Sequence, residues 1–459
     1  MNGTIKPGTS AELRESSGVT SLPRRKFLKL VGASSIALAA PVTVSAPLAA
    51  HQNVSGKGGR LMETDPEVIG WMQGFPPAPD KIIRFEDGSF YKWPQLRWSF
   101  SHIQQLVPTK NVWRGTGAVS SLPRRDMGFE KLSITTDGGD RLMWDEALSA
   151  ASSDGLAIMH KGVLVHESYQ GGCKPHLPHT IMSCAKSIAG ILVEMLIEEG
   201  DLDPNAVMSS YMPEYKNTAW ADATLRQTID MLIGLEFHED YLDKDSDVWR
   251  FLRAGGMIPV SPDDKGPKSI AEYLVTVRKQ GQHGEAFAYR EPNINAVTWL
   301  LQRVTNTDLA DLASSRIWQH IGAEHDACYM LDSVGSCTTM CCTLRDFARL
   351  GEFVRTGGDG KILRPDYIDS LARGGNRQLF AKAGMKAMKG WSYKGLWWIR
   401  HTDRGSQVLA RGAHGQILYI DPEAELVIAR FGSTELSPGY LQDHINLPLF
   451  DAITAHLNR

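Results

Sequence analysis

The chain has 459 residues, of which 42% are hydrophobic and 22% are charged, and its formal net charge is −3. This length and apolar content suffice for one large domain or two closely packed ones. The near-neutral charge balance gives no electrostatic reason to expect binding to nucleic acid or to an anionic membrane surface.

The first 50 residues have the pattern of an export signal. The pair Arg24-Arg25 precedes an apolar stretch at residues 30–40, and small residues such as Ala49-Ala50 follow it. This apolar stretch is too short for an ordinary transmembrane helix. We therefore expect a twin-arginine signal over residues 1–50 and export to the periplasm or the extracellular space, without a stable membrane anchor.

Residues 51–145 contain many proline, glycine, tryptophan and arginine residues and show little periodicity. They are expected to form loops and short elements that wrap around the main body. The main domain, residues 146–459, begins with two apolar runs at 156–159 and 163–165. The short polar break between these runs predicts a β-hairpin.

Residues from about 202 to 390 are expected to form a mainly helical subdomain. The helix that begins near Thr343 has a capping box with Asp346 and ends at Gly357-Gly358. The predicted helices cover residues 224–232, 293–304, 309–320 and 343–355.

After residue 394 the pattern changes to short β-like runs separated by turn residues, which is typical of an antiparallel meander. These runs cover residues 396–399, 407–409, 417–420 and 426–431, and a final helix is predicted at 441–456. We expect the meander to pair with the hairpin in one sheet with helices on its faces, which is an α+β fold.

The six cysteines permit disulfides in an exported protein, but their spacing lacks the paired Cys-x-x-Cys pattern of zinc sites. We interpret them as small buried residues. They are Cys173, Cys184, Cys328, Cys337, Cys341 and Cys342.

The segment Ser183-Cys184-Ala185-Lys186 stands at the start of an apolar helix that Gly200 ends. A serine at a helix N-terminus lies near unpaired N–H groups, and a lysine three residues later lies on the same face. This spacing brings an amine within reach of a hydroxyl, as a serine nucleophile requires of its base. A helix cap followed by a solvated lysine would give the same letters, and the segment alone does not separate the two interpretations.

Three further segments carry groups that a Ser/Lys hydrolase would use. Tyr289 stands just before a predicted helix, where a phenol can relay a proton if a nearby cation lowers its pKa from about 10. The segment 412–416, Gly-Ala-His-Gly-Gln, leads into a predicted strand and can supply a backbone N–H to an oxyanion. The segment Glu239-Asp240-Tyr241 has groups suited to a cleft. Each has a structural alternative: a packing tyrosine, a hairpin turn and a solvated loop.

Other chemistries lack their motifs. The sequence has no His-Glu-x-x-His segment, no Gly-x-Ser-x-Gly elbow and no glycine-rich phosphate loop. We therefore expect neither a metal nor a cofactor, and a small-molecule amide or ester as the partner.

Taken in order, these motifs resemble the serine β-lactamase-like family, which includes class C β-lactamases, DD-peptidases and related esterases. Within it, the likeness is to the 6-aminohexanoate-dimer hydrolase group, and it spans about residues 90–435. The resemblance implies a β-lactamase/transpeptidase-like fold, with an antiparallel sheet flanked by helices and a mainly helical subdomain. The motifs are Ser183-Cys184-Ala185-Lys186, Phe287-Ala288-Tyr289, the segment 343–351 and the segment 412–416.

The resemblance also implies roles for individual residues. Ser183 would be the nucleophile, Lys186 its general base, and Tyr289 the group that aids the base and passes the proton to the leaving group. The backbone N–H groups of Ser183 and Ala413 would form the oxyanion hole. Substrate contacts are expected from Tyr241, Glu291, His414 and Gln416.

Two features depart from the family pattern. Glu291 stands where the motif has a small polar residue, and the strand after residue 412 lacks the Lys-Thr-Gly of β-lactamases. The missing lysine removes a cation suited to a β-lactam carboxylate, and Arg411 is a candidate replacement. Three functions stay open: an amidase or esterase for small linear substrates, a penicillin-recognising enzyme acting on β-lactams or D-Ala peptides, and a non-catalytic binding module on the same fold.

Overall fold

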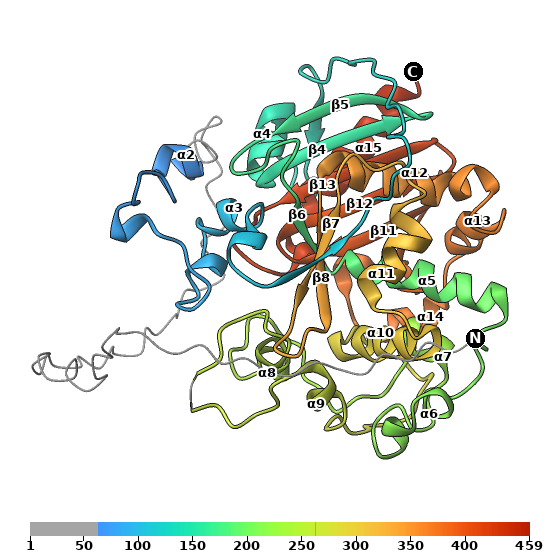
Figure 1. Ribbon diagram of the computed structural model, residues 1–459. Coiled ribbons are helices and arrows are strands. Elements are labelled where there is room, and N and C mark those ends of the chain that lie inside the picture. Colours follow the sequence, from blue (N-terminus) through green and yellow to red (C-terminus); the bar gives the residue numbers. More distant parts are fainter. Residues whose placement is uncertain (1–62, 262) are drawn as a thin grey trace, which may run out of the picture. The chain divides into compact units, whose positions relative to one another are not determined.

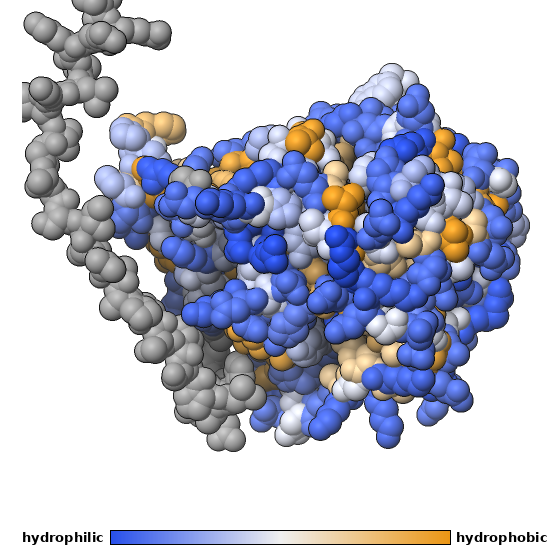
Figure 2. Space-filling view, turned by 90° about the horizontal axis from the view of Figure 1, so that it is seen from below, coloured by the Kyte–Doolittle hydropathy of each residue, from blue (hydrophilic) through white to orange (hydrophobic). Residues whose placement is uncertain are grey.

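The computed structural model describes residues 63–261 and 263–459 (Figure 1). The twin-arginine signal predicted over residues 1–50 lies outside the described residues. None of the described helices combines the length and the apolar content needed to cross a membrane. In Figure 2 one face of the molecule is mainly hydrophilic, with hydrophobic residues in small separate groups.

A seven-stranded antiparallel sheet forms the centre of the molecule, in the order β5-β4-β13-β12-β11-β10-β9. The predicted hairpin and meander are therefore confirmed, and they join in one sheet because β4 pairs with β13, with Ile158 opposite Ile428. The strands are β4 (Ser153–His160), β5 (Val163–Tyr169), β9 (Ser392–Lys394), β10 (Trp397–Thr402), β11 (Gly405–Gly412), β12 (Gln416–Asp421) and β13 (Leu426–Gly432).

Helices cover both faces of this sheet. Neighbouring residues of a strand point to opposite faces, and Leu418 packs under α12 while Tyr419 contacts Phe450 of α15. Gly351 of α12 lies so close to the sheet that a Cβ there would overlap Val427. These two helices are α12 (Leu344–Gly360), whose regular helical backbone ends at Gly357 as predicted, and α15 (Asp443–Leu457).

A second, four-stranded sheet has the order β1-β7-β8-β6. It consists of β1 (Thr109–Val112), β6 (His179–Met182), β7 (Ala327–Leu331) and β8 (Cys337–Cys342). The sequence did not predict β7 and β8, because both are buried along most of their length and so lack the alternation of a half-exposed strand. They interrupt the expected helical region, and β6 leads directly to Ser183.

The helical part lies below the sheets in Figure 1, around α6 to α10. The four predicted helices are confirmed, although residues 309–320 divide into a short α-helix and one π-helical turn, η5 (Ser314–Trp318). The helices are α5 (Ala185–Glu199), α6 (Met208–Tyr211), α7 (Leu225–Ile229), α8 (Asp247–Ala254), α9 (Ile270–Leu274), α10 (Glu291–Thr305), α11 (Leu309–Ala313), α13 (Tyr367–Ala372) and α14 (Arg377–Ala381).

Residues 63–145 form short elements and are attached to the main sheet by a buried ion pair. Arg97 of α3, 1% exposed, donates to Asp154 Oδ1 of β4 at 2.6 Å and to Thr64 Oγ1 at 2.9 Å. The short elements include α2 (Pro66–Ile69), α3 (Leu96–Ser99), β2 (Ser133–Thr135) and β3 (Arg141–Met143), and α4 (Trp144–Ala150) leads from them into β4.

All six cysteines are buried and unpaired, so the interpretation as small buried residues is confirmed. Four of them lie in β7 and β8.

Candidate active site

Ser183 lies in the sharp turn between β6 and α5. The helix begins at Ala185 with Cys184 as its N-cap, so the serine stands one residue before the cap. Met182 precedes it with a φ of 47°, in the left-handed region that a side chain disfavours. This strained residue ends β6, and the half-buried serine follows it at the head of the helix.

Lys186 brings its amine to the serine hydroxyl. The side chain is 5% exposed, and Nζ lies 2.8 Å from Ser183 Oγ. The turn that leads into α5 sets this distance, because the Lys186 backbone N–H binds the Ser183 carbonyl oxygen at 3.1 Å and brings the two residues to the same face. The predicted juxtaposition of hydroxyl and amine is therefore present in the structure.

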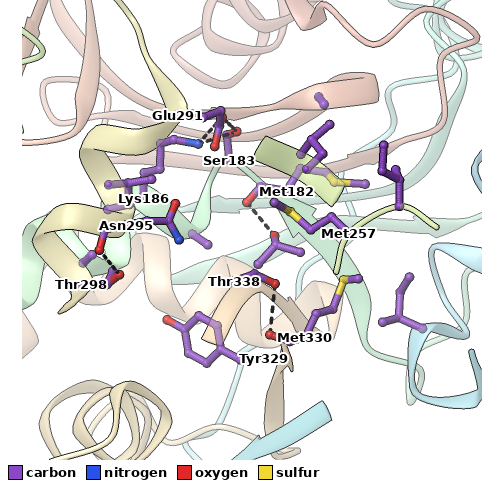
Figure 3. Close-up of a pocket in the computed structure, with 18 of the residues that line it drawn as sticks. Met182, Ser183, Lys186, Met257, Glu291, Asn295, Thr298, Tyr329, Met330 and Thr338 are labelled. Atoms are coloured by element: carbon purple, nitrogen blue, oxygen red, sulfur yellow. Dashed lines mark hydrogen bonds and ion pairs between the residues drawn. The ribbon is translucent and has the colours of Figure 1, made fainter. Parts of the chain in front are cut away.

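Glu291, the first residue of α10, joins this pair. Its Oε1 lies 2.6 Å from Lys186 Nζ and 3.2 Å from Ser183 Oγ, as Figure 3 shows. The positive end of the helix dipole favours a negative charge at this position. The sequence placed Glu291 among substrate contacts, but the structure places its carboxylate on the base itself.

A second carboxyl group, that of Glu239, contacts the backbone of Glu291. Its Oε2 accepts a hydrogen bond of 2.7 Å from the backbone N–H of Glu291. Burial and then the negative charge of Glu291 raise the pKa of Glu239 to about 8, so this group is protonated at neutral pH. No local sequence pattern indicates this contact, because the two glutamates are 52 positions apart.

Tyr241 also reaches the carboxylate. Its hydroxyl lies 3.4 Å from Glu291 Oε1 and 3.5 Å from Glu239 Oε1. Burial raises the pKa of Tyr241 well above its usual value, and the neighbouring carboxylates raise it further. Tyr241 is therefore a neutral hydrogen-bond donor in the wall of the site, and its contact with the substrate stays a prediction.

The aromatic ring of Tyr289 lies next to the Lys186 amine. Its ring is stacked on Trp398, with centroids 5.3 Å apart, and Lys186 Nζ lies 5.2 Å from its centroid. Burial raises the pKa of Tyr289 well above its usual value, and the charges of the two glutamates add to this effect, while its hydrogen bond with Ser183 acts in the opposite direction. The lowering of this pKa by a nearby cation, which a relay through the phenol was expected to need, is not found. The phenol is neutral and able to donate a proton.

The segment 412–416 closes the site from the main sheet. Gly412 ends β11, and a Cβ there would come within 2.6 Å of the Ile181 carbonyl oxygen and 3.0 Å of Met182 Cβ. The missing side chain lets this strand end approach β6 closely. Ala413, which follows it, borders the same space as Ser183, where the predicted oxyanion hole would lie.

The side chains of His414 and Gln416 do not reach that space, which corrects the predicted substrate contacts. His414 is 3% exposed, and its Nδ1 lies 2.7 Å from the Thr434 carbonyl oxygen. Burial lowers the pKa of His414 to about 4, so the ring is neutral. Gln416 is fully buried and exchanges two hydrogen bonds with the backbone of Gly432. His414 lies in the turn before β12, with a φ of 59°, and Gln416 is the first residue of that strand; both side chains point into the protein, where they support the loop.

Two spaces meet at Ser183, and Tyr241 and Ala413 border both. The first, here called the inner cavity, extends between α5, α10, β7 and β8 and is drawn in Figure 3. The second, here called the outer cleft, is bordered by Tyr289, Trp398 and Arg411.

Arg411, the candidate replacement for the β-lactamase lysine, is already engaged. It forms an ion pair with Asp443, and its guanidinium lies 5.4 Å from the ring centroid of Trp391 and 5.9 Å from that of Trp398. It is 8% exposed. A substrate carboxylate would therefore compete with a buried partner for this cation.

Comparisons with known proteins agree with this geometry. The family model described as β-lactamase matches residues 144–447. The chain belongs to the β-lactamase family. It is 30% identical over 354 residues to the 6-aminohexanoate-dimer hydrolase of Paenarthrobacter ureafaciens, a match that covers 75% of this chain and 87% of that protein.

Solved structures show the same family likeness. A Bacillus anthracis protein assigned as a 6-aminohexanoate-dimer hydrolase superposes with a TM-score of 0.75 at 26% identity, over 83% of this chain and 98% of that one. Simvastatin synthase (LovD) from Aspergillus terreus shares the fold, with a TM-score of 0.52 at 14% identity, over 68% of this chain and 96% of that one. The resemblance expected from the motifs is confirmed, and this member of the β-lactamase family is a serine hydrolase of amides or esters.

Proposed function

We propose that the protein cleaves small linear amides or esters through an acyl-enzyme on Ser183. The observation that carries this proposal is the 2.8 Å contact between Ser183 Oγ and Lys186 Nζ at the point where two spaces meet. A hydroxyl needs an adjacent base to become a nucleophile, and the buried amine is that base.

In the acylation step, Lys186 takes the hydroxyl proton while Ser183 Oγ forms a bond to the substrate carbonyl carbon. The negative charge that develops on the carbonyl oxygen is held by the N–H groups of Ser183 and Ala413. The bond to the leaving nitrogen or oxygen then breaks, Tyr289 gives that atom a proton, and the Lys186 ammonium restores the proton of the phenol. Water repeats the sequence in the second half of the reaction and releases the acid.

Glu291 gives the base a charge partner. The base must be neutral before it acts and cationic afterwards, and the carboxylate 2.6 Å away stabilises the ammonium that forms. Glu239 is protonated at neutral pH, so the pair of glutamates carries one negative charge rather than two.

Linear substrates fit better than β-lactams. The strand that borders the outer cleft lacks Lys-Thr-Gly, and Arg411 is held by Asp443. The relative in Paenarthrobacter ureafaciens is named for hydrolysis of the 6-aminohexanoate dimer, a linear amide, which supports linear amides as a substrate class. Export by the twin-arginine route, supported by Arg24-Arg25 and the apolar stretch after it, belongs to the same proposal.

The deciding experiment compares Ser183→Ala with Ser187→Ala on linear amides, p-nitrophenyl esters and nitrocefin. Ser187 is a buried serine on the same helix that donates to the Leu396 carbonyl oxygen and not to Lys186, so it is a matched control. Loss of a nucleophile lowers kcat by roughly 10³- to 10⁶-fold, whereas the control should stay within a few-fold. Covalent labelling of Ser183 by a fluorophosphonate, located by mass spectrometry, is the second measurement. Full ester hydrolysis by Ser183→Ala would exclude the proposal, and prompt nitrocefin turnover would favour a penicillin-recognising enzyme.

A further inference from the structure

The inner cavity has an unusual composition for a site that starts at a charged catalytic pair. Among the residues that line it, only Lys186 and Glu291 carry charge, and these two neutralise each other at its entrance. Most of the remaining wall is aliphatic or aromatic, with Met182, Met257 and Met330 contributed by three different segments. Flexible thioether side chains adapt well to apolar chains of varied length.

The three threonine hydroxyls of the wall use their protons in hydrogen bonds to the backbone. Thr338 Oγ1 donates to the Met330 carbonyl oxygen and Thr298 Oγ1 to that of Asn295, each at 3.1 Å (Figure 3). Thr339 Oγ1 donates in the same way to the Met182 carbonyl oxygen, at 3.1 Å. Because each hydroxyl has a single proton, none of the three is left as a hydrogen-bond donor for a ligand.

The position of Tyr289 decides which half of the substrate enters this cavity. Tyr289 borders the outer cleft and is not part of the inner wall. In the proposed mechanism the phenol gives its proton to the leaving atom, so the leaving group must lie in the outer cleft. The acyl group, on the opposite side of the carbonyl carbon, is then directed into the inner cavity.

We propose that the inner cavity is an acyl-binding site for uncharged, unbranched aliphatic chains, so the preferred substrates are esters or amides of apolar monocarboxylic acids. This inference rests on the proposed function, because it uses Ser183 as the nucleophile and Tyr289 as the proton donor. An acyl chain that ends in an ammonium group is disfavoured. Its charge would lose its contact with water on entering the cavity, and the carboxylate that lines the cavity is already paired with Lys186.

The test is a series of p-nitrophenyl esters with a constant leaving group: acetate, butyrate, hexanoate and octanoate, together with 6-aminohexanoate. Each buried methylene should raise kcat/KM roughly fourfold until the cavity is full. The 6-aminohexanoyl ester should be cleaved at least about tenfold more slowly than the hexanoyl ester of the same chain length.

Two substitutions in the wall of the inner cavity test whether this cavity sets the preferred length of the acyl chain. Thr338→Phe fills the cavity from β8 and should shift the preferred chain to a shorter length, whereas Met257→Ala enlarges it and should shift the preference to a longer one. Thr135→Phe, at an exposed position of β2 that borders neither space, is the matched control and should keep the wild-type order of esters. Thermal unfolding of each variant identifies a failure to fold, in which case the other wall variant carries the test.

The outcomes separate the two proposals. A flat chain-length profile, or faster cleavage of the 6-aminohexanoyl ester, with hydrolysis still abolished in Ser183→Ala, overturns the acyl site and leaves the proposed function in place. Hydrolysis that persists in Ser183→Ala overturns both.

Discussion

The amine nitrogen of Lys186 lies 2.6 Å from Oε1 of Glu291, so the proposed base of this hydrolase is in direct contact with a carboxylate. Both residues are less than a tenth exposed, and the same Oε1 atom is 3.2 Å from the Ser183 hydroxyl. The motif has a small polar residue at this position. The chain therefore couples its nucleophile and base to an additional titratable group.

The first prediction concerns this contact. Glu291→Gln keeps the shape of the side chain but removes the charge that stabilises the protonated amine, and kcat should fall by about 10- to 100-fold. Glu285→Gln, at an exposed position, is the control and should leave kcat unchanged. An unchanged kcat in Glu291→Gln would show that this carboxylate does not assist the base.

The second prediction follows from the raised pKa of Glu239, about 8 in the folded protein against a usual value of 4.5. The folded state holds this proton more tightly than the unfolded state, so the contribution to stability is complete below about pH 4.5 and is lost as the pH rises through about 8. The free energy of unfolding, measured in urea at several pH values, should fall between these limits. In Glu239→Gln this fall should be smaller, since the titrating carboxyl is gone. An equal fall in the variant would assign it to other groups.

The third prediction separates proton transfer by the Tyr289 phenol from a role in positioning its neighbours. Tyr289→Phe keeps the stack on Trp398 but cannot give a proton to a leaving group. Amide hydrolysis should fall by about 10²- to 10⁴-fold, the usual range for a lost general acid. Hydrolysis of p-nitrophenyl esters should fall much less, because p-nitrophenolate leaves without a proton.

Tyr393→Phe is the control for this experiment. Tyr393 is a buried ring that contacts Tyr289 and Trp398 but borders neither the inner cavity nor the outer cleft. Equal losses on amides and on activated esters in Tyr289→Phe would assign the residue to positioning rather than to proton transfer.

The sequence predicted the elements whose pattern is local. Apolar spacing and a terminal glycine defined α5, and turn residues separated the strands of the meander. Strands β7 and β8 were missed because they are buried along most of their length, so a period of two is absent. The pairing of Lys186 with Glu291, 105 positions apart, and the inward direction of His414 depend on packing between distant segments, which no local pattern encodes.

The fourth prediction tests how the N-terminal segment is attached. Arg97 and Asp154 form an ion pair with both side chains almost fully buried, so removing one partner leaves the other without its counter-charge. Arg97→Met should lower the free energy of unfolding by about 3–5 kcal/mol at neutral pH, measured in urea. Burial already raises the pKa of Asp154, and in the variant Arg97 no longer opposes this effect. The loss of unfolding free energy should therefore become smaller as the pH falls, because the Asp154 carboxyl takes up a proton and needs no counter-charge.

The control is Arg303→Met, which removes an exposed ion pair with Glu214 and should change the free energy of unfolding by less than about 1 kcal/mol. Similar losses in the two variants would mean that burial of the Arg97 pair adds nothing to the attachment.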